Sequence, residues 1–199
     1  GQTFMPFQEN INVPTLPFTP LDRPNPLIPE LEMKEEFLER GYIMTMQCQH
    51  FLPGVEPEMI DWWFGWHSVG SDLRYKIWDP EDHYYARQKD RDKAMSQNLP
   101  MRERTWGTTH EVLEDIGPGP DELLDFKYPS EMGYPEELVG TDACASMMCA
   151  NGHGPEPGKG VAAVMTHMIR EIEGGIELRS RFWIGYQIMN GMTMKLIPR

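Results

Sequence analysis

Aromatic and titratable side chains are concentrated between Trp62 and His83. The run begins with Trp62-Trp63-Phe64-Gly65-Trp66-His67 and continues as Arg74-Tyr75-Lys76-Ile77-Trp78-Asp79-Pro80-Glu81-Asp82-His83. Tryptophan and tyrosine offer large rigid faces with one polar group, and a histidine beside them can bind a metal or transfer a proton near neutral pH. The composition therefore favours a lined pocket, with an ordinary buried aromatic core as the alternative.

Histidines elsewhere in the chain give weaker patterns. Cys144, Cys149 and His153 are spaced so that they could share a zinc ion, but they lack the tight Cys-x2-Cys pair of a zinc knuckle. His153 is flanked by Gly152 and Gly154, so we expect it in a loop, where it either contacts a ligand or is exposed to solvent.

The tryptophan run should form a helix from Glu56 to Trp66. Pro57 suits a first helical turn, and Met59 with the three tryptophans recurs at spacings of three and four. His67 then lies at the C-terminal end of this helix. Other expected elements are a helix over 30–40, a strand over 42–46, short strands over 73–78 and 106–116, and a loop or surface helix over 88–104.

The last third of the chain predicts a β-hairpin. Two β-rich runs, 161–172 and 176–189, are separated by Glu173-Gly174-Gly175, where glycine can supply the turn dihedral angles. His167 and Glu171 are four residues apart in the first run, so they share one face of either a strand or a helix.

Length and composition indicate a single soluble domain. The chain has 199 residues, and its range 1–29 holds seven of the eighteen prolines, which predicts an extended arm followed by one domain over 30–199. The net charge of -13 argues against nucleic acid or an anionic membrane as a partner and leaves a small ligand. Three cysteines and the lack of a long apolar run predict a reducing, cytoplasmic location.

Four segments together resemble the diacetylphloroglucinol hydrolase and phloretin hydrolase family. They are Trp62 to His67, Arg74 to His83, Thr109-His110-Glu111-Val112-Leu113-Glu114-Asp115-Ile116-Gly117, and Leu178-Arg179-Ser180-Arg181-Phe182-Trp183-Ile184-Gly185. The resemblance implies an α+β, Bet v 1-like helix-grip fold, in which a curved antiparallel sheet encloses a pocket. It also implies cleavage of the carbon–carbon bond between an acyl group and a phenolic or β-diketone-like ring by zinc-activated water, without a redox cofactor.

The same resemblance implies roles for individual residues. His67 matches the first zinc histidine, and the next ligand is either Glu103 or Glu114. His153 matches a substrate-contacting histidine, which we expect to protonate the departing ring carbon as the catalytic acid. Independently of the resemblance, the helical stripe that ends at His67 leads us to expect Trp66 on the ligand side and Trp63 in the core. We also expect His167 to bind substrate.

Two further zinc ligands of the family form a His-x-x-x-Glu pair on a terminal helix after the Arg-Phe-Trp strand. This chain stops at Arg199 before such a helix, and the pair His167 and Glu171 precedes that strand. Either the chain is truncated or this member has lost part of the zinc site, so we expect a fold without the usual terminal helix, in which zinc could be absent.

These departures leave other functions open. A metal-free cyclase, isomerase or pericyclase could use the same aromatic pocket to fold a polyketide or terpenoid, because such catalysis needs orientation rather than a bound nucleophile. A non-catalytic ligand carrier is a third possibility. An open grip fold would also expose apolar surface, so we expect a homodimer.

Overall fold

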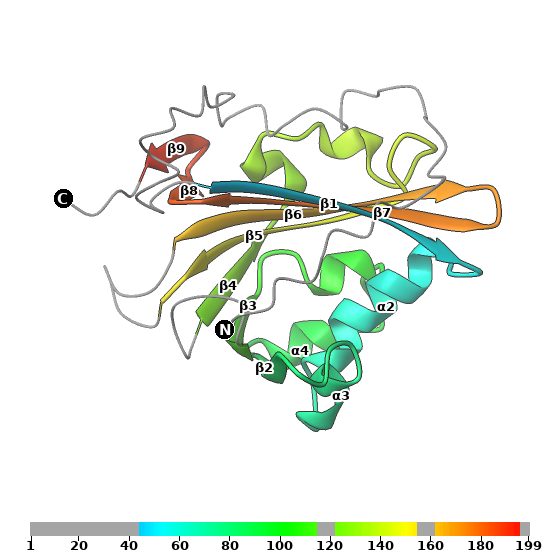
Figure 1. Ribbon diagram of the computed structural model, residues 1–199, viewed down its shortest axis with the longest axis horizontal. Helices are drawn as coiled ribbons and strands as arrows, with labels where there is room; N and C mark the ends of the chain where they lie inside the picture. The colour runs from blue at the N-terminus through cyan, green and yellow to red at the C-terminus, as the bar shows by residue number, and fades with distance from the viewer. Residues whose placement is uncertain (1–43, 115–121, 155–161, 196–199) are drawn as a thin grey trace.

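The computed structural model describes residues 44–114, 122–154 and 162–195. Within them, seven strands form one antiparallel sheet in the order β1-β7-β6-β5-β4-β3-β2, and β8 pairs with β9 separately (Figure 1). The arm expected over 1–29 and the helix expected over 30–40 lie outside the described residues. The predicted α+β class with an antiparallel sheet around a pocket is confirmed.

The large sheet and the small hairpin account for most of the described chain. The strands are β1 (Met44–Pro53), β2 (His83–Gln88), β3 (Thr109–Glu114), β4 (Glu122–Lys127), β5 (Ser146–His153), β6 (Ala163–Ile172), β7 (Gly175–Ile184), β8 (Tyr186–Met189) and β9 (Met192–Lys195). The α-helices are α2 (Pro57–His67), α3 (Leu73–Lys76) and α4 (Arg91–Ala94). The described residues also contain three single 3-10 turns, which are η2 (Arg102–Arg104), η3 (Pro129–Met132) and η4 (Glu136–Leu138). No helix in the described residues is long and apolar enough to cross a membrane.

The sheet curls around the helices, which lie on its concave side (Figure 1). Side chains alternate between the two faces of a strand, so each strand contributes one row to this side. In β4, Leu124 and Phe126 point inward, whereas Asp125 lies on the outer face beside Thr109 and His153. The alternation therefore separates an inner, mostly apolar row from an outer polar one.

Helix α2 is held on the concave face by apolar contacts and one buried polar contact. Ile60 packs in a cluster with Ile169, Ile176 and Leu178 of β6 and β7. The Ser146 hydroxyl of β5 donates a hydrogen bond to the buried Asp61 carboxylate. A hydrogen bond between buried groups is directional, so it fixes the rotation of the helix as well as its position.

The predicted helix and hairpin are confirmed, but the strand expected over 73–78 is wrong. Leu73–Lys76 forms the short helix α3 instead. The Arg74 side chain explains the turn, because it folds back to donate hydrogen bonds to the carbonyl oxygens of Trp66 and Val69, just past the end of α2. Carbonyls at a helix C-terminus lack partners within the helix and attract a cation.

Two strand boundaries also differ from expectation. The strand expected over 106–116 begins only at Thr109, because Gly107 turns the chain with φ 67° and the Trp106 ring is buried. The second hairpin strand is divided into β7 and β8 at Gly185, which has φ 86°. Strands β4 and β5 were not predicted from the sequence.

The outer face of β6 and β7 carries a buried ion cluster. The Glu177 carboxylate accepts hydrogen bonds from Arg170 at 2.7 Å and from Arg179 at 2.6 Å, and all three residues are buried. A buried carboxylate requires such partners, because removal from water otherwise disfavours its charge strongly. The pairing with Glu177 therefore accounts for one buried arginine in β6 and one in β7.

The buried Asp61 should make stability depend on pH. Burial raises the pKa of Asp61 from 3.8 to about 6, against the opposing effects of the Ser146 hydrogen bond and the Arg102 charge. The folded state thus favours the protonated acid, and this contribution is complete below pH 3.8 and lost as the pH rises through 6. Asp61→Asn is always neutral and can still accept from Ser146. Relative to wild type, it should gain roughly 2–3 kcal/mol of unfolding free energy between pH 4 and pH 7.

Urea unfolding at the two pH values measures this difference, and the pH dependence of other groups cancels between the two proteins. Asp142→Asn, at an exposed position, is the control and should show no such gain. If Asp61→Asn changed the free energy of unfolding by the same amount at both pH values, the raised pKa of Asp61 would be contradicted.

Candidate functional site

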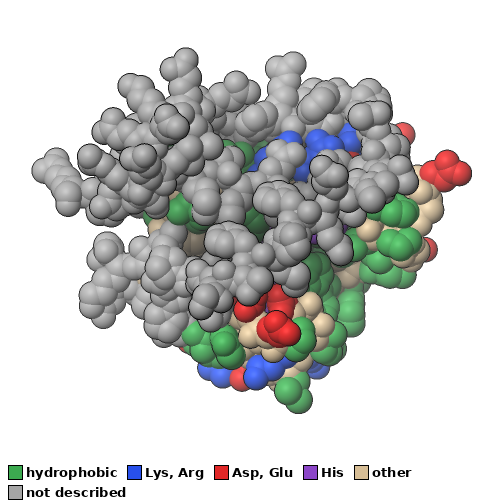
Figure 2. Space-filling view, viewed as in Figure 1, with side chains coloured by type: hydrophobic (Ala, Val, Ile, Leu, Met, Phe, Trp, Pro, Cys, Tyr) green, Lys and Arg blue, Asp and Glu red, His purple; other side chains and the backbone are tan. Residues whose placement is uncertain are grey.

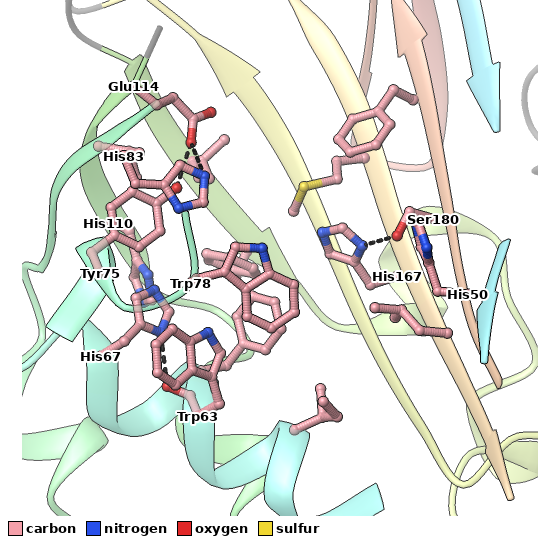
Figure 3. A pocket seen from close by; sticks show the side chains of 18 residues that line it. His50, Trp63, His67, Tyr75, Trp78, His83, His110, Glu114, His167 and Ser180 are labelled. Atoms are coloured by element: carbon pink, nitrogen blue, oxygen red, sulfur yellow. Dashed lines mark hydrogen bonds and ion pairs between the residues drawn. The ribbon is translucent and has the colours of Figure 1, made fainter. Parts of the chain in front are cut away.

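A cavity of about 280 Å³ lies between the concave face of the sheet and helices α2 and α3 (Figure 3). Five of the six histidines of the chain line it, together with aromatic rings and one carboxylate. The polar and aromatic lining residues are His50, Trp63, Phe64, His67, Tyr75, Trp78, His83, His110, Glu114, Phe126, His167, Ser180 and Phe182.

His67 ends helix α2 and is only 4% exposed. Its Nδ1 lies 2.7 Å from the carbonyl oxygen of Trp63, and a carbonyl can only accept, so Nδ1 carries the proton. The neutral ring therefore keeps its lone pair on Nε2. Burial lowers the pKa of His67 from 6.5 to about 4, so this neutral form prevails at pH 7.

Four rings from three elements form a continuous stack beside the cavity. Trp63 stacks on His67 with centroids 5.2 Å apart, His67 on Tyr75 at 5.3 Å, and Tyr75 on His83 at 4.0 Å. The interplanar angles are 14°, 23° and 5°. The stack fixes the plane of His67, which has a ring on each side, and that of His83, which lies against Tyr75 at the end of the stack.

Glu114 lies at the far end of this stack. Its Oε2 accepts a hydrogen bond from the Tyr75 hydroxyl and lies 3.7 Å from His83 Nε2. Of the two glutamates considered as zinc ligands, Glu114 lines the cavity. Glu103 lies in η2 and is not among the lining residues.

A second polar group lies on the opposite wall (Figure 3). His167 of β6 places Nδ1 2.6 Å from the hydroxyl oxygen of Ser180 on β7, its direct partner in the strand register. Desolvation lowers the pKa of His167 to about 4, so it too is neutral at pH 7. His167 therefore meets the expectation of a pocket residue in its location.

Two other residues named from the sequence lie away from the cavity. Trp66 does not line it, but stacks on Trp62 at 4.8 Å and lies 4.3 Å below the Arg74 guanidinium. His153 is the last residue of β5 rather than part of a loop, and its Nε2 lies 3.1 Å from Asp125 on the outer face of the sheet. His153 is thus separated by the thickness of the sheet from the histidines that line the cavity.

The two cysteines considered with His153 are buried, and Cys149 accepts a contact from the Thr166 hydroxyl. Across the described ranges, no three histidine, cysteine, aspartate or glutamate side chains come together closely enough to hold a metal ion. The zinc site considered for Cys144, Cys149 and His153 is therefore not formed in the described part of the chain.

The cavity also includes residues that the sequence reading did not assign to a site, namely Tyr75, His83, His110 and Ser180. His110 is 1% exposed, and burial with the neighbouring His67 keeps its pKa well below 6.5. Alternation in the strand could have revealed it, because His110 and Glu114 are an even number of residues apart and so share a face.

These features define a class of protein: an α+β fold whose curved antiparallel sheet encloses an aromatic pocket with neutral histidines on two walls. The site can stack an aromatic ligand, accept a proton at His67 Nε2 and form hydrogen bonds from the walls. Comparison with known proteins gives the particular family.

The family model described as "DAPG hydrolase PhiG domain" matches residues 31–198, and the chain belongs to this family. It is 51% identical over 150 residues to a phloretin hydrolase of Eubacterium ramulus, covering 74% of this chain and 53% of that protein. It is 30% identical over 154 residues to a 2,4-diacetylphloroglucinol hydrolase of a Pseudomonas species, covering 73% and 49%. The chain therefore spans about half the length of these relatives.

Solved structures show more distant likenesses. One is protein CV1439 of Chromobacterium violaceum, with a TM-score of 0.38, 12% identity, and coverage of 69% of this chain and 77% of that one. Another is a norcoclaurine synthase point mutant with a transition-state analogue, with a TM-score of 0.39, 12% identity, and coverage of 71% and 76%.

The tryptophan helix gives a second prediction. We had expected Trp66 on the ligand side and Trp63 in the core, but Trp63 lines the cavity and lies 5.7 Å from Trp78. Trp63→Ala should weaken the binding of an aromatic ligand such as phloroglucinol by about tenfold or more, because a stacking face is lost. Trp66→Ala should lower unfolding free energy by roughly 2 kcal/mol, less than a core tryptophan, with smaller loss of affinity.

Calorimetric titration and urea unfolding of the two variants make the comparison. Equal affinity losses in both would show that the tryptophans serve only as packing.

Proposed function

We propose that this chain carries the active site of a hydrolase that cleaves the carbon–carbon bond between an acyl group and a phenolic ring. The names of the two hydrolase relatives and membership of their family support the reaction class. The observation that carries the proposal is the lone pair of His67 Nε2, held in a fixed ring orientation beside an aromatic cavity.

The overall reaction adds one water across the bond between the ring and the ketone carbon. The hydroxyl of the water joins the carbonyl carbon to give a carboxylic acid, and the ring carbon gains a proton. His67 is the proposed base for water, because its Nε2 is unprotonated at neutral pH. His167, on the opposite wall, is the proposed hydrogen-bond partner of a substrate oxygen.

The stacked rings supply the remaining requirement, which is orientation. An aromatic substrate held between the tryptophan side and the histidine walls loses its rotational freedom before the reaction, and this lowers the barrier. The mostly apolar cavity also excludes bulk water, which strengthens each polar contact inside it.

The use of zinc is a separate part of the proposal. His67 also suits a ligand, since its Nδ1 is already fixed by the Trp63 carbonyl; with zinc bound, the Nε2 lone pair would hold the metal instead of accepting a proton. Glu114 lines the same cavity, but the described residues contain no group of three donors that could hold a metal. They do not complete a zinc site, so no step is assigned to the metal. When bound, zinc would polarise the ketone and activate water.

Incubation with an acylphloroglucinol, followed by mass spectrometry, tests the reaction. We expect a released carboxylic acid and a deacylated ring, and we expect His67→Ala to lower kcat at least 100-fold, the usual contribution of a general base. Circular dichroism checks that the variant is folded. A product of unchanged mass would contradict hydrolysis and favour the metal-free cyclase or isomerase alternative, whereas binding without turnover would favour a carrier.

Elemental analysis of the purified protein tests the zinc part separately. Full hydrolytic activity with no bound metal would contradict a role for zinc, while His67 would remain the proposed base. The homodimer also stays a prediction, which light scattering checks, and the cytoplasmic location stays one as well.

A further inference from the structure

We propose that Arg74 is a positioning residue for the candidate site, and that it holds Tyr75 of α3 against His67 at the end of α2. The inference rests on the proposed function for the role of His67, but its first test needs no turnover. Arg74 is not among the residues that line the cavity, so it acts through the two rings that do.

Arg74 contacts the end of α2 in three ways. Its Nη1 donates hydrogen bonds to the carbonyl oxygen of Trp66, at 3.0 Å, and to that of Val69. Its guanidinium carbon lies 4.3 Å from the centre of the Trp66 ring. Carbonyls at a helix C-terminus carry partial negative charge, and the face of an aromatic ring also attracts a cation. All three contacts therefore favour a positively charged side chain at this position.

The turn between α2 and α3 leaves room for this side chain. Gly70, in the middle of the turn, has φ 132°, a backbone conformation that side chains rarely allow. A Cβ atom at this position would lie 3.0 Å from the Arg74 guanidinium carbon. The guanidinium thus occupies the space that a larger residue at position 70 would take.

Helix α3 needs such an attachment, because it has only four residues and an isolated helix of that length is unstable. Leu73 and Ile77, at its two ends, are 68% and 69% exposed, and apolar side chains lie on the surface at the bottom of Figure 2, where Figure 1 places α3. The buried residue of α3 is Tyr75, which packs in an apolar cluster with β2 and β3. Tyr75 therefore attaches the helix to the sheet, and Arg74 attaches it to α2.

The ring stack lies where these two attachments meet (Figure 3). The centroid of the Tyr75 ring is 5.3 Å from that of His67 on one side and 4.0 Å from that of His83 on the other. His83 belongs to the sheet, where it lies opposite Glu114, and a register shift in β2 follows it. The contact with His67 depends instead on the junction of α2 and α3. Loss of Arg74 should therefore separate Tyr75 from His67 and leave its contact with His83 in place.

Aromatic NOE spectroscopy of the full chain compares the two contacts. Arg74→Met keeps the aliphatic stem and removes the charge and the donors, so it should weaken the NOE from Tyr75 to His67 relative to the NOE from Tyr75 to His83. The NOE falls with the sixth power of distance, so a shift of about 1 Å, enough to impair catalysis, lowers it roughly threefold. An unchanged ratio of the two NOEs in the folded variant would overturn the inference.

Arg74→Lys is the conservative variant. Both hydrogen bonds come from one nitrogen of Arg74, so a lysine ammonium can donate to the same two carbonyls and should keep the NOE ratio near that of wild type. Arg74→Gln keeps a donor without the charge and should give an intermediate ratio, which also serves if Arg74→Met does not fold. Equal ratios in the lysine and glutamine variants would contradict the role of the cation.

Leu73→Ala is the matched control, because Leu73 is an exposed neighbour on the same helix. It should keep the wild-type NOE ratio. A ratio lowered as much as in Arg74→Met would show that α3 detaches after any change, and would also overturn the inference.

Turnover of an acylphloroglucinol gives the second readout. In Arg74→Met, kcat per folded molecule should fall about tenfold or more and KM should change less, because a displaced His67 affects the reaction more than the binding of the ring. Arg74→Lys should recover most of this loss. A lower unfolding free energy with unchanged kcat would make Arg74 merely structural. If the NOE ratio depends on Arg74 but the wild-type protein cleaves no acylphloroglucinol, the positioning of the rings stands and the proposed function is refuted.

Discussion

The seating of α2 against the concave face of the sheet determines where the site lies. Ile60 and Phe64 reach into apolar clusters, while Asp61 is fixed by Ser146, so two successive turns of the helix meet the sheet. His67 follows at the end of the same helix and has no freedom of its own, since its ring is bound to Trp63. The position of a residue along α2 therefore determines where its side chain lies relative to the cavity.

Burial has opposite consequences for the charges of this acidic chain on the two sides of the sheet. Inside, it keeps His67, His110 and His167 neutral, because the apolar lining disfavours imidazolium. Outside, Glu177 stays buried only with two arginines bonded to it. One sheet thus supports neutral histidines beside the cavity on one face and a carboxylate paired with two arginines on the other.

Helical periodicity and glycine turns were enough to predict α2, with His67 at its end, and the β6–β7 hairpin. The α3 segment was misread because its helix depends on Arg74 reaching back to α2, a contact between elements that no local pattern contains. His153 and His167 both occur in β-strands, and only the strand register decides which of them faces inward. The sequence left Glu103 and Glu114 as alternatives, and only the structure shows that Glu114 lines the cavity. Its partners Tyr75 and His83 come from segments whose fold had to be known first.

The register shift in β2 also affects how the molecule avoids its neighbours. Among the described strands, β2 forms one end of the sheet, where unpaired backbone groups could extend onto the sheet of another molecule. An irregularity of this kind increases local twist and interrupts the straight edge that such pairing needs. The same distortion that accompanies the His83 contact with Glu114 thereby protects the open edge against aggregation.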